Sequence, residues 1–249
     1  AQQIDGSISS AGHLIIDNPS GVTLNSSIQV QDRLCLKAGS ITAGIYSISY
    51  AEGAELHYQG SSAQTSSSAE FPSTSGPDIL RIDNASGVSL HASRTLDSTL
   101  FLVSGTLNNS SNNITLSNEQ KIVRYAGSLT TAPVFPANID LDYRSPVSIS
   151  TSYELPSSTS VLRDLSVNCP QTLGLNSSAT INGILNLNIG SFDNSSSTLS
   201  LADGVIMNIR TGSLAAAPSF GTTLDLNYLG DIHYESGYEI PSSSTVVQD

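Results

Sequence analysis

Basic residues are scarce in this chain, and charged residues of either sign are few. Nine of the 249 residues are Lys or Arg and 21 are Asp or Glu, so the formal net charge at pH 7 is −12. Nucleic acids and anionic membrane surfaces are both bound through clusters of Lys and Arg. The composition therefore argues against a nucleic acid or an anionic membrane surface as the partner of this protein.

Long apolar runs are missing as well. The chain has no stretch of about 18 consecutive apolar residues, the length from which a membrane-spanning helix is expected, so we expect no insertion into a membrane. Its first residues, AQQIDG, contain neither an initiator Met nor the charged and apolar segments of a secretion signal. We interpret the chain as a mature secreted protein, located outside the cell or at the cell surface.

What the sequence does contain is an internal repeat. The segment GTLNNSSNNITLSNEQ starts at Gly105 and matches GSFDNSSSTLSLADG, which starts at Gly190, so the offset is 190 − 105 = 85. The match continues without a gap to the end of the chain. Residues 80–164 and 165–249 are therefore two copies of one unit.

A shorter copy, residues 14–79, precedes these two. Its segment IDNPSGVTL matches IDNASGVSL at an offset of 66, whereas Leu56 matches Leu141 at an offset of 85. This copy has therefore lost 85 − 66 = 19 residues, between Gly39 and Leu56. A globular domain rarely loses so many core residues, whereas a solenoid can lose one complete coil because each coil contacts only its neighbours.

Apolar and polar residues alternate over short stretches within each copy, as at Ile139, Leu141 and Tyr143. Such alternation predicts short strands with one buried face, and the Gly, Asn, Asp, Ser and Pro between them predict turns. A sandwich or a propeller is the alternative, but neither explains the repeat of 85 residues or the loss of 19. We predict an all-β fold, a single right-handed parallel β-helix (β-solenoid) over residues 1–249. It has about twelve coils of roughly 20 residues, with four coils to each repeat.

The two cysteines, Cys35 and Cys169, fall at positions that are not equivalent in the repeat and are several coils apart. The Cα atoms of a disulfide lie within about 7 Å of each other. We therefore expect two isolated thiols rather than an intrachain disulfide.

Three segments of the last copy, Leu162–Asn168, Thr180–Leu187 and Ser197–Leu201, form short apolar strands that follow a proline turn. They resemble the repeats of large secreted proteins from Bacteroidetes-like bacteria, and the resemblance extends over nearly the whole chain. It implies an extracellular β-solenoid that serves as a stalk or an adhesin.

The residue types of catalytic and metal sites are dispersed along the chain. The four histidines, His13, His57, His91 and His233, show no metal-ligand spacing, and we expect them at the surface or at coil edges. We therefore expect no metal site, no cofactor and no enzymatic activity.

Acidic residues give two weaker signals. Asp140 and Asp142 precede Arg144, a set typical of carbohydrate-active β-helices, but Leu229 replaces the arginine in the next copy. We interpret this set as solvent-facing partners of the buried strand residues. Calcium bound in turns is left open, although Asp-Gly pairs such as the one at Asp203 occur without the repeated motif of calcium-binding solenoids.

Two further features recur. Tyr58, Tyr143 and Tyr228 stand 85 residues apart and continue the apolar alternation, so we predict that they point inward and pack in the core or at a coil edge. Six asparagines satisfy the N-glycosylation pattern, and we interpret them as turn residues in an Asn-rich and Ser-rich chain. They are Asn25, Asn84, Asn109, Asn113, Asn176 and Asn194.

One motif invites a functional interpretation. YELPSST begins at Tyr153, returns as YEIPSSS at Tyr238 and appears more loosely as AEFPSTS at Ala69. Proline fixes φ and lacks an N–H, which suits a corner between strands, and we predict a structural turn. Whether its glutamate faces solvent, a cation or a neighbouring chain is left open. The residues of this turn motif are Glu70, Pro72, Glu154, Pro156, Glu239 and Pro241.

The sequence thus predicts an extracellular structural protein, a segment of a cell-surface fibre, stalk or adhesin. Its expected partners are further copies of itself, neighbouring domains of a longer chain, or surface glycans. The alternative is a carbohydrate-binding or polysaccharide-processing β-helix, which the fold class alone suggests.

Overall fold

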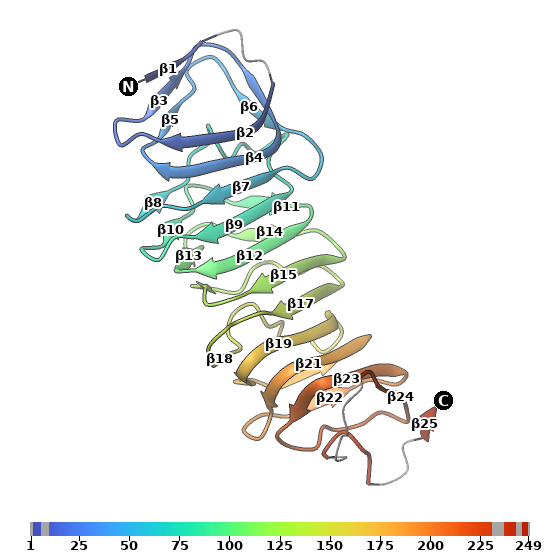
Figure 1. The fold of residues 1–249 in the computed structure, drawn as a ribbon. Coiled ribbons are helices and arrows are strands. Elements are labelled where there is room, and N and C mark those ends of the chain that lie inside the picture. The colour runs from blue at the N-terminus through green and yellow to red at the C-terminus, as the bar shows by residue number, and fades with distance from the viewer. Residues whose placement is uncertain (1, 6–9, 231–236, 243–245, 249) are drawn as a thin grey trace. The chain divides into compact units, whose positions relative to one another are not determined.

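The computed structural model describes residues 2–5, 10–230, 237–242 and 246–248 (Figure 1). All regular elements within these ranges are β-strands, which confirms the predicted all-β class. The described residues accordingly include no helix that could cross a membrane.

The chain divides into two compact units. The first comprises residues 1–117 and 127–134, and the second comprises residues 118–126 and 135–249. Strands of the first unit are β1 (Gln2–Ile4), β2 (Ser10–Asp17), β3 (Val22–Leu24), β4 (Ile28–Ala38), β5 (Ile41–Thr42), β6 (Ile48–Tyr50), β7 (Glu55–Tyr58), β8 (Gln64–Thr65), β9 (Ile79–Asp83), β10 (Val88–Ser89), β11 (Arg94–Leu96), β12 (Thr99–Ser104), β13 (Thr106–Asn108), β14 (Ile114–Leu116) and β16 (Ser128–Leu129). Strands of the second unit are β15 (Gln120–Arg124), β17 (Ile139–Tyr143), β18 (Ile149–Ser150), β19 (Leu162–Gly174), β20 (Ala179–Ile181), β21 (Ile184–Asp193), β22 (Leu199–Leu201), β23 (Val205–Leu214), β24 (Thr223–Tyr228) and β25 (Val246–Gln248).

Each unit is a stack of coils joined by parallel strands. In the first unit the largest sheet has the order β2-β4-β7-β9-β12, and in the second it has the order β15-β17-β19-β21-β23-β24-β25. Neighbouring coils are roughly 20 residues apart, and the chain makes about eleven of them, against the expected twelve or so. The β-solenoid is therefore confirmed, while its right-handed course stays a prediction.

The core runs along the inside of these coils as ladders of apolar side chains. In the first unit Leu34, Leu56, Leu80 and Leu100 are partners in successive strands, and each is 0% exposed. Burial of one such side chain stabilises the fold by about 1.5–3 kcal/mol. Alternation with a period of two residues, which the sequence showed, places the intervening side chains on the outer face.

Smaller sheets form the other sides of the coils. In the first unit they have the orders β1-β3-β5, β8-β10-β13-β16 and β11-β14, and in the second unit β20 pairs with β22. Two of these sheets of the first unit have end strands, β5 and β8, that lie close together in sequence. β5 pairs with β3 and β8 pairs with β10, but within the described part of the chain β5 and β8 do not pair with each other.

A glycine closes the same corner in each copy. Gly39, Gly105 and Gly190 have φ angles of 79°, 70° and 87°. A Cβ atom built on Gly190 would lie 1.6 Å from the carbonyl oxygen of Cys169, and one on Gly105 would lie 1.8 Å from that of Asn84. The repeat therefore keeps glycine here because the backbone of the preceding coil leaves no room for a side chain.

Candidate functional site

The turn motif places its glutamates inside the protein. Glu70, Glu154 and Glu239 lie in turns and are 3%, 0% and 8% exposed. Their carboxylates therefore do not face solvent, which was one of the arrangements left open by the sequence. The three prolines of the motif, Pro72, Pro156 and Pro241, lie outside the strands in the same loops.

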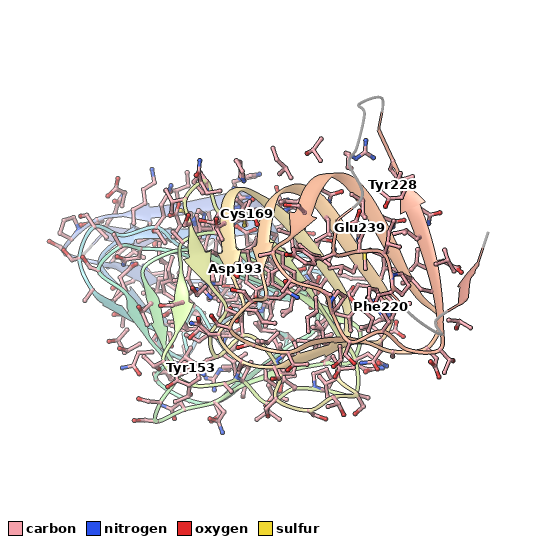
Figure 2. The ribbon with its side chains drawn as sticks, turned by 90° about the horizontal axis from the view of Figure 1, so that it is seen from below. Tyr153, Cys169, Asp193, Phe220, Tyr228 and Glu239 are labelled. Atoms are coloured by element: carbon pink, nitrogen blue, oxygen red, sulfur yellow. The ribbon has the colours of Figure 1, made fainter. Side chains whose placement is uncertain are left out.

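Each glutamate accepts a hydrogen bond from the tyrosine hydroxyl of its own copy. The donor–acceptor distances are 3.0 Å for Tyr58 and Glu70, 2.9 Å for Tyr143 and Glu154, and 3.0 Å for Tyr228 and Glu239 (the last pair is labelled in Figure 2). A backbone N–H of the turn donates to the same carboxylate, from Ser67, Ser152 and Gly237 respectively. We call this arrangement the tyrosine–glutamate corner.

The three tyrosines differ in how deeply they are buried. Tyr58 and Tyr143 are each 1% exposed, as in a core, whereas Tyr228 is 41% exposed although its hydroxyl is directed to Glu239 in the same way. Burial and the neighbouring glutamate raise the pKa of Tyr58 and Tyr143 well above the usual value, and the same causes raise the pKa of Tyr228 to about 12. All three hydroxyls therefore remain protonated donors near neutral pH.

The second corner also contains a cation. Arg124, at the end of β15, forms an ion pair with Glu154 and donates a hydrogen bond to the carbonyl of Ser150 at 2.8 Å. Its guanidinium is buried, and Arg124 is the strand partner of Tyr143. The cation offsets part of the desolvation penalty that a buried carboxylate incurs.

The other two corners have an apolar residue in the position of this arginine. The strand partner of Tyr58 is Leu36, and the strand partner of Tyr228 is Ile209. Among the described residues Glu70 forms no ion pair. Burial raises the pKa of Glu70, although hydrogen bonds from Ser67 and Tyr58 act in the opposite direction.

A groove opens directly beside Glu70. Its volume is about 470 Å³, and it is lined on one side by residues 36–40 and on the other by residues 61–65 together with Ser67 and Glu70. A second hollow of about 430 Å³ continues it between residues 41–48 and the turn that contains Ser67, Ala69 and Pro72. Ser67 lines both hollows, and we call them together the seam groove.

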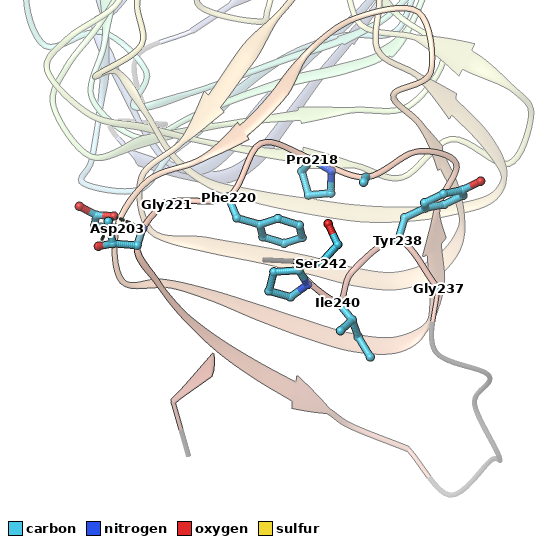
Figure 3. Close-up of a pocket in the computed structure, with 11 residues that line it drawn as sticks. Asp203, Pro218, Phe220, Gly221, Gly237, Tyr238, Ile240 and Ser242 are labelled. Atoms are coloured by element: carbon cyan, nitrogen blue, oxygen red, sulfur yellow. Dashed lines mark hydrogen bonds between the residues drawn. The ribbon is translucent and has the colours of Figure 1, made fainter. Parts of the chain in front are cut away.

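Another groove lies in the second unit (Figure 3). Its volume is about 550 Å³, and Pro218, Phe220 and Ile240 line it together with Tyr238. Ile240 is 46% exposed, whereas Leu155, its counterpart one repeat earlier, is 6% exposed. This groove therefore presents apolar and aromatic surface to solvent.

The histidines are dispersed, as the sequence indicated, but one of them is not at the surface. His57 is 6% exposed and lies between two carboxylates, 3.8 Å from Glu55 and 3.9 Å from Asp83. Burial lowers its pKa, so it is neutral near pH 7. His13 is exposed and pairs with Asp32.

His91 contacts the hydroxyl of Ser66 at 2.7 Å, and His233 lies outside the described residues. Within the described ranges no three His, Cys, Asp or Glu side chains are grouped as a metal site would require. Asp203, the residue considered for calcium, accepts hydrogen bonds from the N–H and the hydroxyl of Thr222.

The acidic set on β17 is less exposed than predicted. Asp142 is 6% exposed and pairs with Arg144 at 2.6 Å, and Asp140 pairs with Arg163 at 2.8 Å. The prediction that these carboxylates face solvent is therefore wrong for Asp142, because neighbouring side chains on the outer face cover it. The two cysteines, Cys35 and Cys169, are free and buried.

Three of the glycosylation-pattern asparagines are buried turn residues. Asn84 and Asn109 are 0% exposed and Asn194 is 4% exposed. The side chain of Asn194 donates to the carbonyl of Ala216 and accepts from its N–H, both at 2.9 Å. These amides therefore link one coil to the next, which supports their interpretation as turn residues.

Comparison of the chain with protein-family models, with curated proteins and with solved structures found no match.

Proposed function

We propose that the protein is a non-enzymatic structural segment of an extracellular fibre, stalk or adhesin at the cell surface. One observation carries this proposal: the residues that recur from copy to copy are mainly those that build the interior. The tyrosine–glutamate corner and the corner glycine each occur once in every one of the three copies. A protein whose task is to extend needs this kind of repetition, because each coil must support the next.

The outer face changes between copies. Arg144, directly after β17, becomes Leu229 at the equivalent position, and Asp142 becomes Asn227. A binding or catalytic site copied for avidity would repeat its exposed side chains rather than its core. The pattern therefore favours a scaffold over an array of identical sites.

Side-chain hydrogen bonds also run from coil to coil on the outer face of the second unit. The amide of Asn208 donates to Asn186 at 2.9 Å, and the amide of Asn227 donates to Asn208 at 3.1 Å. Such an amide ladder adds cross-links along the direction in which coils stack. It supports a mechanical role, with further copies or neighbouring domains as the partners.

Immunogold electron microscopy of intact source cells tests the proposal. Antibodies raised against the purified chain are expected to label filaments or stalks outside the cell. Label confined to the cell interior, or short monodisperse particles without attachment to any polymer or surface, would contradict the structural role.

A second candidate function is glycan binding, favoured by exposed aromatic side chains. Tyr153 and Tyr238 occupy equivalent turns and are 52% and 54% exposed, and Tyr238 lines the groove of Figure 3 with Phe220. A glycan array with the wild type and with Tyr238→Ala separates the two candidates. Tight binding to one polysaccharide that Tyr238→Ala abolishes would replace the purely structural proposal.

A further inference from the structure

The structure locates the coil that the first copy lacks. The N–H of Ala51 donates to Val30, and the N–H of Ser117 donates to Leu96, so the two copies correspond at an offset of 66 as far as Ala51. From Leu56 onward the offset is 85. The missing 19 residues therefore lie among the counterparts of residues 118–140, and they include the counterparts of Arg124 and of β16.

That coil supplies two things in the second copy. It contains β16, which pairs with β13, and it contains Arg124, which neutralises Glu154. In the first copy the counterpart of β13 is β5, which is the end strand of its sheet: among the described residues β5 pairs with β3 alone. The first copy therefore lacks both a second strand beside β5 and the arginine that would pair with Glu70. Arg94, which donates to the carbonyl of Phe71 at 2.6 Å, interacts electrostatically with Glu70 but forms no ion pair with it among the described residues.

In the large sheet the strands on either side of the missing coil pair directly, but in the smaller sheets they do not. β4 pairs directly with β7, whereas β5 and β8 end on opposite sides of the seam groove. The side chain of Gln64 crosses the groove and donates to the carbonyl of Leu36 at 3.1 Å. The same carbonyl, in β4, also accepts the backbone N–H of Gln59 at 2.9 Å, so the Gln64 amide is a second donor that links the two walls of the groove.

We propose that the seam groove binds an extended peptide segment that carries an arginine or a lysine. The peptide backbone adds to the strand edge at β5 or β8, and the basic side chain pairs with the carboxylate of Glu70. Addition of a strand to an open sheet edge is an established mode of peptide recognition. The volume of about 470 Å³ falls in the range of about 300–1,000 Å³ that ligand sites occupy.

Charge complementarity identifies the side chain that the peptide must carry. Glu70 is 3% exposed, lines the groove and has no ion-pair partner in the described part of the chain, while its counterpart Glu154 is paired with Arg124. The segment Arg124–Leu129, RYAGSL, also shares Ala-Gly-Ser with Leu36–Ile41, LKAGSI, which forms one wall of the groove. A peptide with the sequence RYAGSL can therefore follow the same backbone course as residues 36–41.

Fluorescence anisotropy with a labelled RYAGSLTT peptide, residues 124–131, tests the proposal on the full chain. We expect saturable binding, at least tenfold weaker for the peptide with Arg124→Gln, because a charge-assisted bond is lost. In the protein variant Glu70→Gln the two peptides should bind alike. Glu239→Gln, which changes the corner of the other unit, serves as the matched control and should keep the tenfold difference.

Three results would overturn the proposal. They are no binding of the peptide, equal binding of a scrambled peptide, and equal binding of free arginine, which would reduce the site to one for a small cation. The variant Ala63→Trp gives a test that leaves the corner intact, because Ala63 is exposed and lines the groove. It should block the peptide; unchanged binding to this variant would place the peptide elsewhere.

Discussion

The hydroxyl of Tyr143 donates to the carboxylate of Glu154 at 2.9 Å, and both side chains are shielded from water. The same pair of residue types meets in all three copies of the repeat, so a polar contact is part of an otherwise apolar interior. In the second copy Arg124, Tyr143 and Ser152 all donate to the same carboxylate oxygen, Oε1 of Glu154. Such a hydrogen-bonded network in the interior favours one arrangement of the chain. The corner therefore fixes where each loop turns inward.

Removal of the charge on Glu154 should be costly. In Glu154→Gln the buried guanidinium of Arg124 loses its partner, and breaking one side of a buried ion pair costs about 3–5 kcal/mol. Glu239→Gln should cost clearly less, because Ile209 stands in the place of the arginine there. Urea denaturation of the two variants checks this difference, and equal losses in the free energy of unfolding would show that the ion pair contributes nothing.

The carboxylate of Glu70, which accepts hydrogen bonds but forms no ion pair among the described residues, makes stability depend on pH. Burial raises its pKa in the folded state, so the folded protein binds this proton more tightly than the unfolded chain does. This contribution is fully present below the unfolded pKa of about 4.3 and is lost as the pH rises through the higher folded pKa.

The variant Glu70→Gln isolates that contribution. The free energy of unfolding of the wild type, measured relative to Glu70→Gln, should fall between pH 4 and pH 7. A difference that stays constant or rises over this interval would contradict an elevated pKa. Glu239→Gln, the same substitution in the third copy, can be measured in parallel.

The corner glycines should tolerate no side chain. Gly190→Ala places a Cβ against the carbonyl oxygen of Cys169, so we expect a loss of more than about 3 kcal/mol in the free energy of unfolding. Gly204 is the matched control, since its φ is 73° and no atom lies within 4 Å of an added Cβ. Gly204→Ala should therefore cost only the backbone term of about 1–2 kcal/mol. Thermal or urea unfolding that ranks the two variants in the opposite order would contradict the steric account.

The buried asparagines should contribute to stability rather than carry glycans. Asn194→Ala removes both bonds to the backbone of Ala216 and should cost about 2 kcal/mol. Asn176→Ala, at an exposed position, should change the free energy of unfolding by less than about 0.5 kcal/mol. Mass spectrometry after treatment of the folded protein with an oligosaccharyltransferase gives a second readout. A glycan on Asn194 would show that its amide is accessible.

The fold could be predicted because its determinants are local and repeated. Alternation with a period of two residues identified the leucine ladders, and the uneven offsets identified a structure that loses whole coils. The match between Gly105 and Gly190 already marked a position where the backbone requires glycine. These signals need no knowledge of which residues meet across the interior.

The inward glutamates were not predicted, because the direction of a side chain in a turn has no periodic pattern. One signal could have found them: tyrosine and glutamate are 12 residues apart in the first corner and 11 apart in the other two. The pairing with Arg124 had no such signal, since a single copy carries the arginine. The burial of Asp142 likewise had no repeated signal, because its ion-pair partner Arg144 is replaced by leucine in the next copy.

The missing coil of the first copy has a consequence for how such a chain can vary. The pairing of β4 with β7 has a continuous register, as does the pairing of β15 with β17. The main sheet therefore accepts the deletion without a change of register at the joined strands. The length of the protein is thus adjustable in increments of one coil. Each shortening leaves an unmatched strand edge on the opposite side, so a change in length also creates a new surface.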